Sequence, residues 1–125
     1  MDIPKLLCEF FKVKEYQKGV FEVQTSYMIF ANVPFVFVIE KQGQSFKITD
    51  KRMILTFLSK LYDLSSGDVK ACLRDVLKIN KVSLSKGEMF VMVENEQEFA
   101  FKLANFLVCA GQLIRMQAFF DNPEN

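Results

Sequence analysis

The segment EFAFKLANFLVCAGQLIRMQAFF, Glu98–Phe120, constrains the rest of the chain most strongly, because it has the pattern of one long helix with a very broad apolar surface. Asn95 stands three residues before Glu98, the spacing of a capping pair, and Glu94 and Glu96 add negative charge at the positive end of the helix dipole. The broad face carries Phe99, Leu103, Phe106, Leu107, Ala110, Leu113 and Ile114. The narrow strip opposite carries Glu98, Lys102, Asn105 and Gln112, so this helix needs cover on more than one side.

The flank and the end of this helix leave two alternatives open. Either the helix packs in the groove of a curved sheet of its own chain, or Phe101 and Val108, beside the polar strip, face a second copy or another protein. Phe119 and Phe120 either fold back onto the core or anchor a partner, since aromatic side chains are frequent binding hot spots. Lys102 interrupts the apolar run, which is therefore too short for a membrane span, and no membrane partner is expected.

The composition is that of a globular protein. The chain has 125 residues, of which 50% are hydrophobic and 25% charged, and this is enough to bury a core. We predict a single domain over residues 1–125, with 121–125 as a frayed tail. The 16 basic and 15 acidic residues nearly cancel, so no global field attracts the chain to nucleic acid or membrane.

The cysteines and the N-terminus indicate the compartment. Cys8, Cys72 and Cys109 are widely separated, without the paired spacing of a zinc or redox site, and are interpreted as core residues. The stretch Met1–Pro4 has no basic region before an apolar one, as a signal peptide would. We therefore expect a location in the reducing cytoplasm.

The order of the expected elements gives the fold class. A helix is predicted first, then strands and two further helices, and last a hairpin before the long helix: Pro4–Lys12, Val20–Gln24, Tyr27–Phe30, Phe35–Glu40, Ser45–Thr49, Lys51–Tyr62, Asp68–Lys78, Val82–Leu84 and Glu88–Val93. Turns at Gln42-Gly43 and Ser85–Gly87 mark two hairpins, and Thr49 or Asp50 is placed to cap the helix that follows. We predict an α+β fold in which an antiparallel sheet of hairpins packs against the long C-terminal helix, with an N-terminal helix and two middle helices.

Three stretches resemble a bacterial and phage family that is known only as a domain of unknown function, DUF1828. They are GVFEVQT (Gly19–Thr25), VPFVFVIEKQGQSFKITD (Val33–Asp50) and VSLSKGEMFVMVENEQEFAFKLANFL (Val82–Leu107). The family pattern has a hairpin that ends in a hydrophobic-Thr-Asp motif, matched here by Thr49-Asp50. The Asp-Gly that often follows is replaced by Lys51-Arg52. The resemblance implies a small α+β domain from bacteria, prophages or mobile elements, so that the expected cytoplasm is that of a bacterial host cell. It implies no activity.

The chain lacks the usual inventory of an enzyme. It has no histidine, which removes the common activation of Ser and Cys nucleophiles and most zinc and iron sites, and its five glycines form no phosphate-binding loop. Glu22, Glu40 and Asp50 could share an edge of the sheet and act as paired carboxylates, but such residues are more often solvated or structural. We predict that the protein is not an enzyme and needs neither cofactor nor metal.

A basic stripe is the strongest polar feature. Lys70, Arg74 and Lys78 recur every four residues, Lys81 and Lys86 follow, and residues 68–86 contain only two acidic residues, Asp68 and Asp75. The stripe is either an ordinary solvated helix face or a surface for phosphates or an acidic protein. No aromatic residue is interleaved with it, so stacking of single-stranded bases is not indicated.

These features lead to one functional hypothesis and one alternative. The first is a non-catalytic protein-binding domain of phage or mobile-element origin, acting on a nucleic-acid-processing effector as an inhibitor of a host defence nuclease, as anti-CRISPR proteins do. The alternative is a nucleic-acid-binding or regulatory accessory domain that uses Lys70, Arg74 and Lys78. The candidate partner-binding residues are Lys70, Arg74, Lys78, Phe101, Val108, Phe119 and Phe120, and a homodimer is among the expected assemblies.

Overall fold

The computed structural model describes residues 2–7, 11–30 and 33–116. The helices and strands run in the order α1 (Ile3–Leu7), β1 (Lys12–Gln17), β2 (Val20–Phe30), β3 (Val33–Gln42), β4 (Ser45–Thr49), α2 (Met53–Ser59), α3 (Gly67–Ile79), β5 (Ser83–Ser85), β6 (Glu88–Val93) and α4 (Glu96–Ile114). The order confirms an α+β fold with a C-terminal helix.

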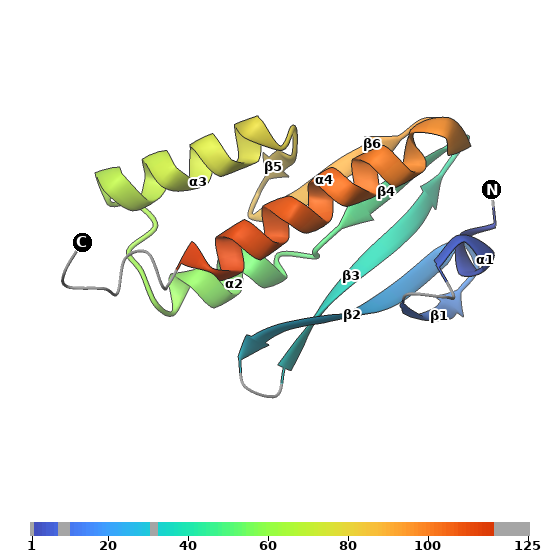
Figure 1. Cartoon of the computed structure of the whole chain (residues 1–125), viewed down its shortest axis with the longest axis horizontal. Coiled ribbons are helices and arrows are strands. Elements are labelled where there is room, and N and C mark those ends of the chain that lie inside the picture. The colour runs from blue at the N-terminus through green and yellow to red at the C-terminus, as the bar shows by residue number, and fades with distance from the viewer. Residues whose placement is uncertain (1, 8–10, 31–32, 117–125) are drawn as a thin grey trace.

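The strands form one antiparallel sheet with the spatial order β1-β2-β3-β4-β6-β5. Figure 1 shows α4 lying along the sheet, with α3 beside it and α2 following the end of β4. The predicted antiparallel sheet of hairpins packed against the long helix is therefore confirmed. Because the three longer helices contact the β4–β6–β5 half and α1 contacts β1, alternate strand residues point into one shared core.

Helix α4 begins as the sequence predicts. The Asn95 side chain accepts a hydrogen bond from the Glu98 amide at 3.1 Å, and Glu96 and Glu98 lie in the first turn. At the middle of the helix Phe106 is fully buried, with its ring 5.8 Å from that of Phe37 and 6.3 Å from that of Phe35. The broad face of α4 is thus covered by the chain's own sheet, as the first alternative requires.

The flank of α4 is not covered in the same way. Phe101 is 63% exposed and Val108 is 49% exposed. The structure therefore covers the broad face of α4 and leaves the flank with Phe101 and Val108 exposed. In the part of the chain that the structure describes, no helix is both long enough and apolar enough to cross a membrane.

The N-terminal helix is much shorter than predicted. Helix α1 has five residues, and the predicted helical range up to Lys12 is wrong at its end because Lys12 begins β1. Strand β1 pairs with β2 around a turn in which Gly19 has a φ of +78°. Pairing with β2 places the apolar Val13 against the core and leaves its charged neighbours in solvent, which is why the strand forms despite four charged or amide side chains.

The two short strands predicted at Val20–Gln24 and Tyr27–Phe30 are one strand, β2. Its register against β3 shifts between Gln24 and Met28, so the polar interruption is an irregularity within the strand and not its end. Inside this irregular stretch the Thr25 hydroxyl donates a 2.7 Å hydrogen bond to the Phe35 carbonyl, which keeps the two strands joined.

The other elements match their predictions closely. Strand β4 has the predicted bounds, the β5–β6 hairpin turns at Lys86 and Gly87 with positive φ at both, and α3 extends the predicted helix by one residue at each end. Helix α2 is shorter than the predicted range Lys51–Tyr62. It starts at Met53 because Lys51 and Arg52 both have left-handed backbone conformations, with φ of 52° and 69°.

Candidate functional site

The basic stripe of α3 lies along the rim of a groove. Helix α3 buries Val69, Leu73 and Leu77 at intervals of four residues, so the side chains one position later, Lys70, Arg74 and Lys78, all emerge on one exposed side. The structure thus confirms that these three predicted residues share one face. It also adds a neighbouring apolar surface, which the sequence did not predict.

The groove runs between α3, β5 and the segment from Leu55 to Leu64, with a volume of about 630 Å³. Its apolar lining consists of Leu55, Leu64, Leu73, Leu77, Val82 and Leu84, and the small residues Gly67 and Ala71 complete it. Leu84 is 40% exposed, and Lys70, Arg74 and Lys78 supply the charge. None of the described lining residues is acidic or aromatic. The groove therefore combines an apolar floor with a cationic rim.

Two of the three cations at the rim are available to a ligand. Arg74 Nε lies 3.3 Å from Asp75 Oδ1, but both side chains are largely exposed and such a pair contributes little. Among the described residues, Lys70 and Lys78 have no carboxylate within ion-pair distance. A bound carboxylate or phosphate would therefore meet two lysines that give up no ion pair.

The remaining predicted residues do not join this groove. Phe101 lines a small hollow with β5 and β6, and Val108 lines another with β2. Lys81 lines the Phe101 hollow and Lys86 occupies the β5–β6 turn. Phe119 and Phe120 lie outside the described residues.

The cysteines agree with a core interpretation where the structure describes them. Cys109 is fully buried on α4, and this burial raises the pKa of its thiol to about 12. Cys72 is half-buried on α3, and burial again raises its pKa. Both thiols are therefore poor nucleophiles, and Cys8 lies outside the described residues.

Asp50 is a buried anchor that joins three elements. Its side chain accepts hydrogen bonds from the amides of Arg52 (2.9 Å), Ile54 (3.0 Å) and Met89 (3.0 Å), and the residue is 2% exposed. The first two bonds hold the entry to α2 and the third holds β6. The predicted capping role of Asp50 is thus confirmed, although it acts from three residues before the helix start, and its bond to β6 was not predicted.

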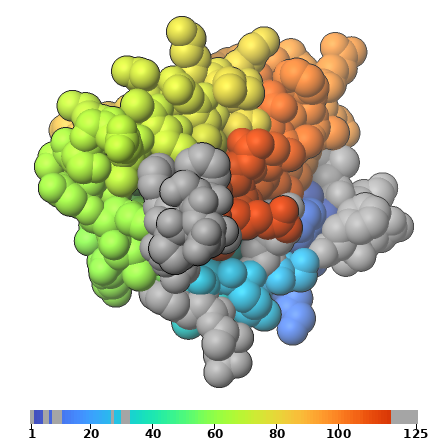
Figure 2. Space-filling view, turned by 60° about the vertical axis from the view of Figure 1, so that its left-hand side comes forward, coloured from blue at the N-terminus to red at the C-terminus, as the bar shows by residue number. Residues whose placement is uncertain are grey.

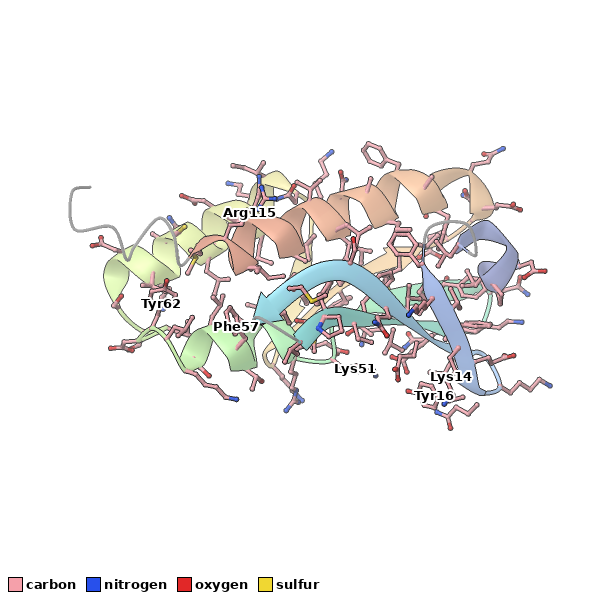
Figure 3. All side chains as sticks on the ribbon, turned by 60° about the horizontal axis from the view of Figure 1, so that its bottom comes forward. Lys14, Tyr16, Lys51, Phe57, Tyr62 and Arg115 are labelled. Atoms are coloured by element: carbon pink, nitrogen blue, oxygen red, sulfur yellow. The ribbon has the colours of Figure 1, made fainter. Side chains whose placement is uncertain are left out.

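A polar network lies next to this anchor, and the sequence reasoning missed its central residue, Glu88. One Glu88 oxygen is 2.9 Å from Lys47 Nζ, and the other accepts the Thr49 hydroxyl. Lys51 Nζ lies 2.7 Å from Glu40 and 3.9 Å from Glu88. In Figure 3, Lys51 lies below the sheet, on the side away from α4. Burial acts to raise the pKa of Glu88, but the bonds to Lys47 and Thr49 outweigh it and the pKa is lowered.

The network does not assemble the three carboxylates considered for catalysis. Glu40 is paired with Lys51, and Asp50 is occupied by backbone amides. Glu22 is exposed on β2 and takes part in none of the ion pairs of the described chain. What the cluster does is stabilise the junction of β3, β4, β6 and α2.

One family model covers both this junction and the α3 groove. The family model described as "Domain of unknown function DUF1828" matches residues 27–112. The chain belongs to this family. The DUF1828 match runs from the last residues of β2 through most of α4 and includes the Asp50 anchor and all residues of the α3 groove. No curated protein and no solved structure matches the chain.

The departure from the DUF1828 pattern at Lys51-Arg52 has a structural meaning. The resemblance implies Gly where this chain has Arg52, and Arg52 has a φ of 69°, which non-glycine residues adopt at a cost. We predict that Arg52→Gly raises the free energy of unfolding by about 0.5–1 kcal/mol, measured by urea denaturation. Lys60→Gly, at a right-handed helix end, is the control and should lower it by a similar amount. Destabilisation by both variants would contradict the strain argument.

Proposed function

We propose that this DUF1828 domain is a non-catalytic protein-binding domain that holds an amphipathic, acidic segment of its partner in the α3 groove. The observation that carries the proposal is the combination in one groove of six apolar side chains with Lys70, Arg74 and Lys78. An amphipathic helix binds such a groove through apolar anchors at helical spacing, and acidic side chains beside the anchors would meet the cationic rim. Lys70 and Lys78 have no ion-pair partner among the described residues, and this supports an anionic component in the ligand.

The groove favours a protein ligand over nucleic acid. Phosphates would use the rim but leave the apolar floor in water, and bases would find no aromatic side chain among the described lining residues. The net charge of +1 adds no general attraction for nucleic acid. Nucleic-acid binding through Lys70, Arg74 and Lys78 is therefore the alternative outcome of the same experiment.

The inhibitor role is the specific form of this proposal. In that role, the domain comes from a phage or mobile element and binds an acidic segment of a nuclease of the bacterial host, inside the host cytoplasm. A basic groove would act there by occupying part of the effector protein, and not by imitating its nucleic-acid ligand. Plaque formation by a phage under attack from such a nuclease should rise when the wild-type domain is expressed and not when the charge-reversed variant below is expressed.

Selection from a displayed library of random peptides tests the groove directly. The selected peptides should carry apolar residues at helical spacing with Asp or Glu beside them. Lys70→Glu/Lys78→Glu should weaken their binding about tenfold or more, and wild-type binding should weaken with added salt. The matched control is Lys12→Glu/Lys14→Glu, which makes the same change in net charge at the exposed strand β1. Fluorescence anisotropy provides the dissociation constants.

Three results would overturn the proposal. One is enrichment of peptides without acidic residues. A second is equal loss of binding in the β1 control. The third is salt-sensitive binding of oligonucleotides, lost only in Lys70→Glu/Lys78→Glu, with no peptide enriched, and this result would establish the nucleic-acid alternative.

A further inference from the structure

The outer side of α4 carries an exposed stripe that belongs neither to the core nor to the α3 groove. It consists of Gln97, Phe101, Ala104, Val108, Gly111 and Arg115, all exposed except Gly111, which is half-buried. These positions follow one another at intervals of three or four residues, so they form one continuous line along the helix. Along that line the larger Phe101 and Val108 alternate with the small Ala104 and Gly111, and Arg115 stands at the C-terminal end.

The stripe contains both a projection and a hollow. Phe101, at the N-terminal half of α4, is 63% exposed. Toward the C-terminal half, the absence of a side chain at Gly111 contributes to a hollow of about 520 Å³ between α4 and Met28 of β2. Figure 2 shows this end of α4 at the surface, between α3 and the cyan end of the sheet. Met28 is itself 53% exposed, so the hollow has an accessible apolar side, while Ser26, Gln112 and Arg115 add polar groups to its lining.

The stripe is complementary to itself when a second copy is turned end for end. Positions 97 and 115, 101 and 111, and 104 and 108 are each equally far from Phe106. If two α4 helices pack antiparallel about a twofold axis at the level of Phe106, Phe101 of one copy comes level with the Gly111 hollow of the other. Ala104 comes level with Val108 in the same way, so a small side chain meets a branched one.

The charges on α4 favour the same antiparallel arrangement. Arg115 is exposed at the end of the helix, as Figure 3 shows, and Glu96 is exposed in the first turn. Antiparallel packing brings Arg115 of each copy to the acidic start of the other helix and opposes the two helix dipoles. A parallel pair would instead place Arg115 against Arg115. Because the stripe fits itself in size, and Glu96 beside it is opposite in charge to Arg115, we propose that it is the interface of a homodimer of this chain.

The dimensions of the stripe set the expected strength of the dimer. Nineteen helical residues extend over roughly 28 Å and a helix is about 10 Å wide, so the stripe offers on the order of 300 Å² per copy before its β2 flank is added. This is below the size of a typical stable interface. The dimer should therefore dissociate in the micromolar range, and its α3 grooves remain open because no residue belongs to both surfaces.

Sedimentation equilibrium over about 1–500 µM protein tests the dimer, with the 14.5 kDa chain mass as the monomer reference. The wild type should change from one to two chain masses within this range. Phe101→Ala should weaken the association about tenfold or more, because an apolar anchor is lost. Ile79→Ala removes another exposed side chain, 77% exposed on α3, and should leave the association unchanged.

A charge exchange tests the antiparallel register. Arg115→Glu and Glu96→Arg should each weaken the dimer, since each places like charges together across the interface. The double variant should recover the wild-type dissociation constant, because each new arginine then faces a new glutamate. Circular dichroism confirms that each variant is folded. A monomer at all concentrations, a dimer insensitive to Phe101→Ala, or no recovery in the double variant would overturn the proposal, and none of these results bears on the α3 groove.

Discussion

Asp50→Ala is expected to lower the free energy of unfolding by about 3–5 kcal/mol, one of the two largest effects that a single substitution should have in this chain. The variant removes the side-chain acceptor of three backbone amides, those of Arg52, Ile54 and Met89. Ile54 and Met89 are fully buried, so water cannot easily replace the carboxylate. A buried donor without a partner costs about 1–3 kcal/mol, and the loss falls on two elements at once.

Denaturation by urea or guanidinium, monitored by far-ultraviolet circular dichroism, measures this effect. Asp63→Ala is the matched control, because Asp63 also accepts a backbone amide hydrogen bond, from Ser65, but is exposed. The control should change the free energy of unfolding by less than about 1 kcal/mol. Similar losses in the two variants would show that burial of the Asp50 amides does not matter.

The difference between wild type and Asp50→Ala should also depend on pH. Burial raises the pKa of Asp50, and it outweighs the amide hydrogen bonds, which act to lower it. A raised pKa in the folded state means that the stabilisation linked to protonation is fully present below the unfolded pKa, about 3.9, and is lost as pH rises through the folded pKa. The stability difference should therefore be smallest at neutral pH and grow as pH falls through this window.

The hydrogen bond that the Met89 amide donates to Asp50 could not have been predicted from the sequence. Asp50 has a local signal, since an acidic residue just before an apolar helical pattern indicates a cap. Met89 is 39 positions away and gives no sign that its amide needs a side-chain acceptor. The same holds for Glu88 on β6. Its partners Lys47 and Thr49 lie on β4, and the two strands come together only when the chain between them folds.

The groove divides in the same way between predictable and unpredictable parts. Its rim could be predicted, because Lys70, Arg74 and Lys78 follow helical periodicity within one segment. Its floor could not, because Leu55, Leu64 and Leu84 come from three segments that only the packing of α2, α3 and β5 brings together. Strand β1 was not predicted, for a related reason. Its stability comes from pairing with β2, whereas the local pattern of apolar residues up to Phe11 favoured a helix.

Phe106→Ala is expected to lower the free energy of unfolding by about 3–5 kcal/mol, through loss of buried aromatic surface and the cavity that remains. Phe106 is fully buried where α4 crosses the sheet, and its ring contacts those of Phe35 and Phe37. Both neighbours are fully buried on β3, a strand paired on both sides, so the backbone has little freedom to close the cavity. Guanidinium denaturation measures the loss, and a smaller midpoint with an unchanged slope would show that the native state remains compact.

Phe101→Ala, on the opposite side of the same helix, is the control for this prediction and also tests the proposed dimer. Because Phe101 is 63% exposed, its removal should change the stability of the monomer by no more than about 0.5 kcal/mol. Above the dimer dissociation constant the same variant should lose additional stability, since dimerisation stabilises the folded state in proportion to the logarithm of protein concentration. Phe106→Ala should lose stability equally at low and high concentration as long as the dimer still forms. A loss for Phe101→Ala at every concentration, as large as that for Phe106→Ala, would mean that Phe101 is buried within a single chain, and the outer stripe of α4 would then not be an interface.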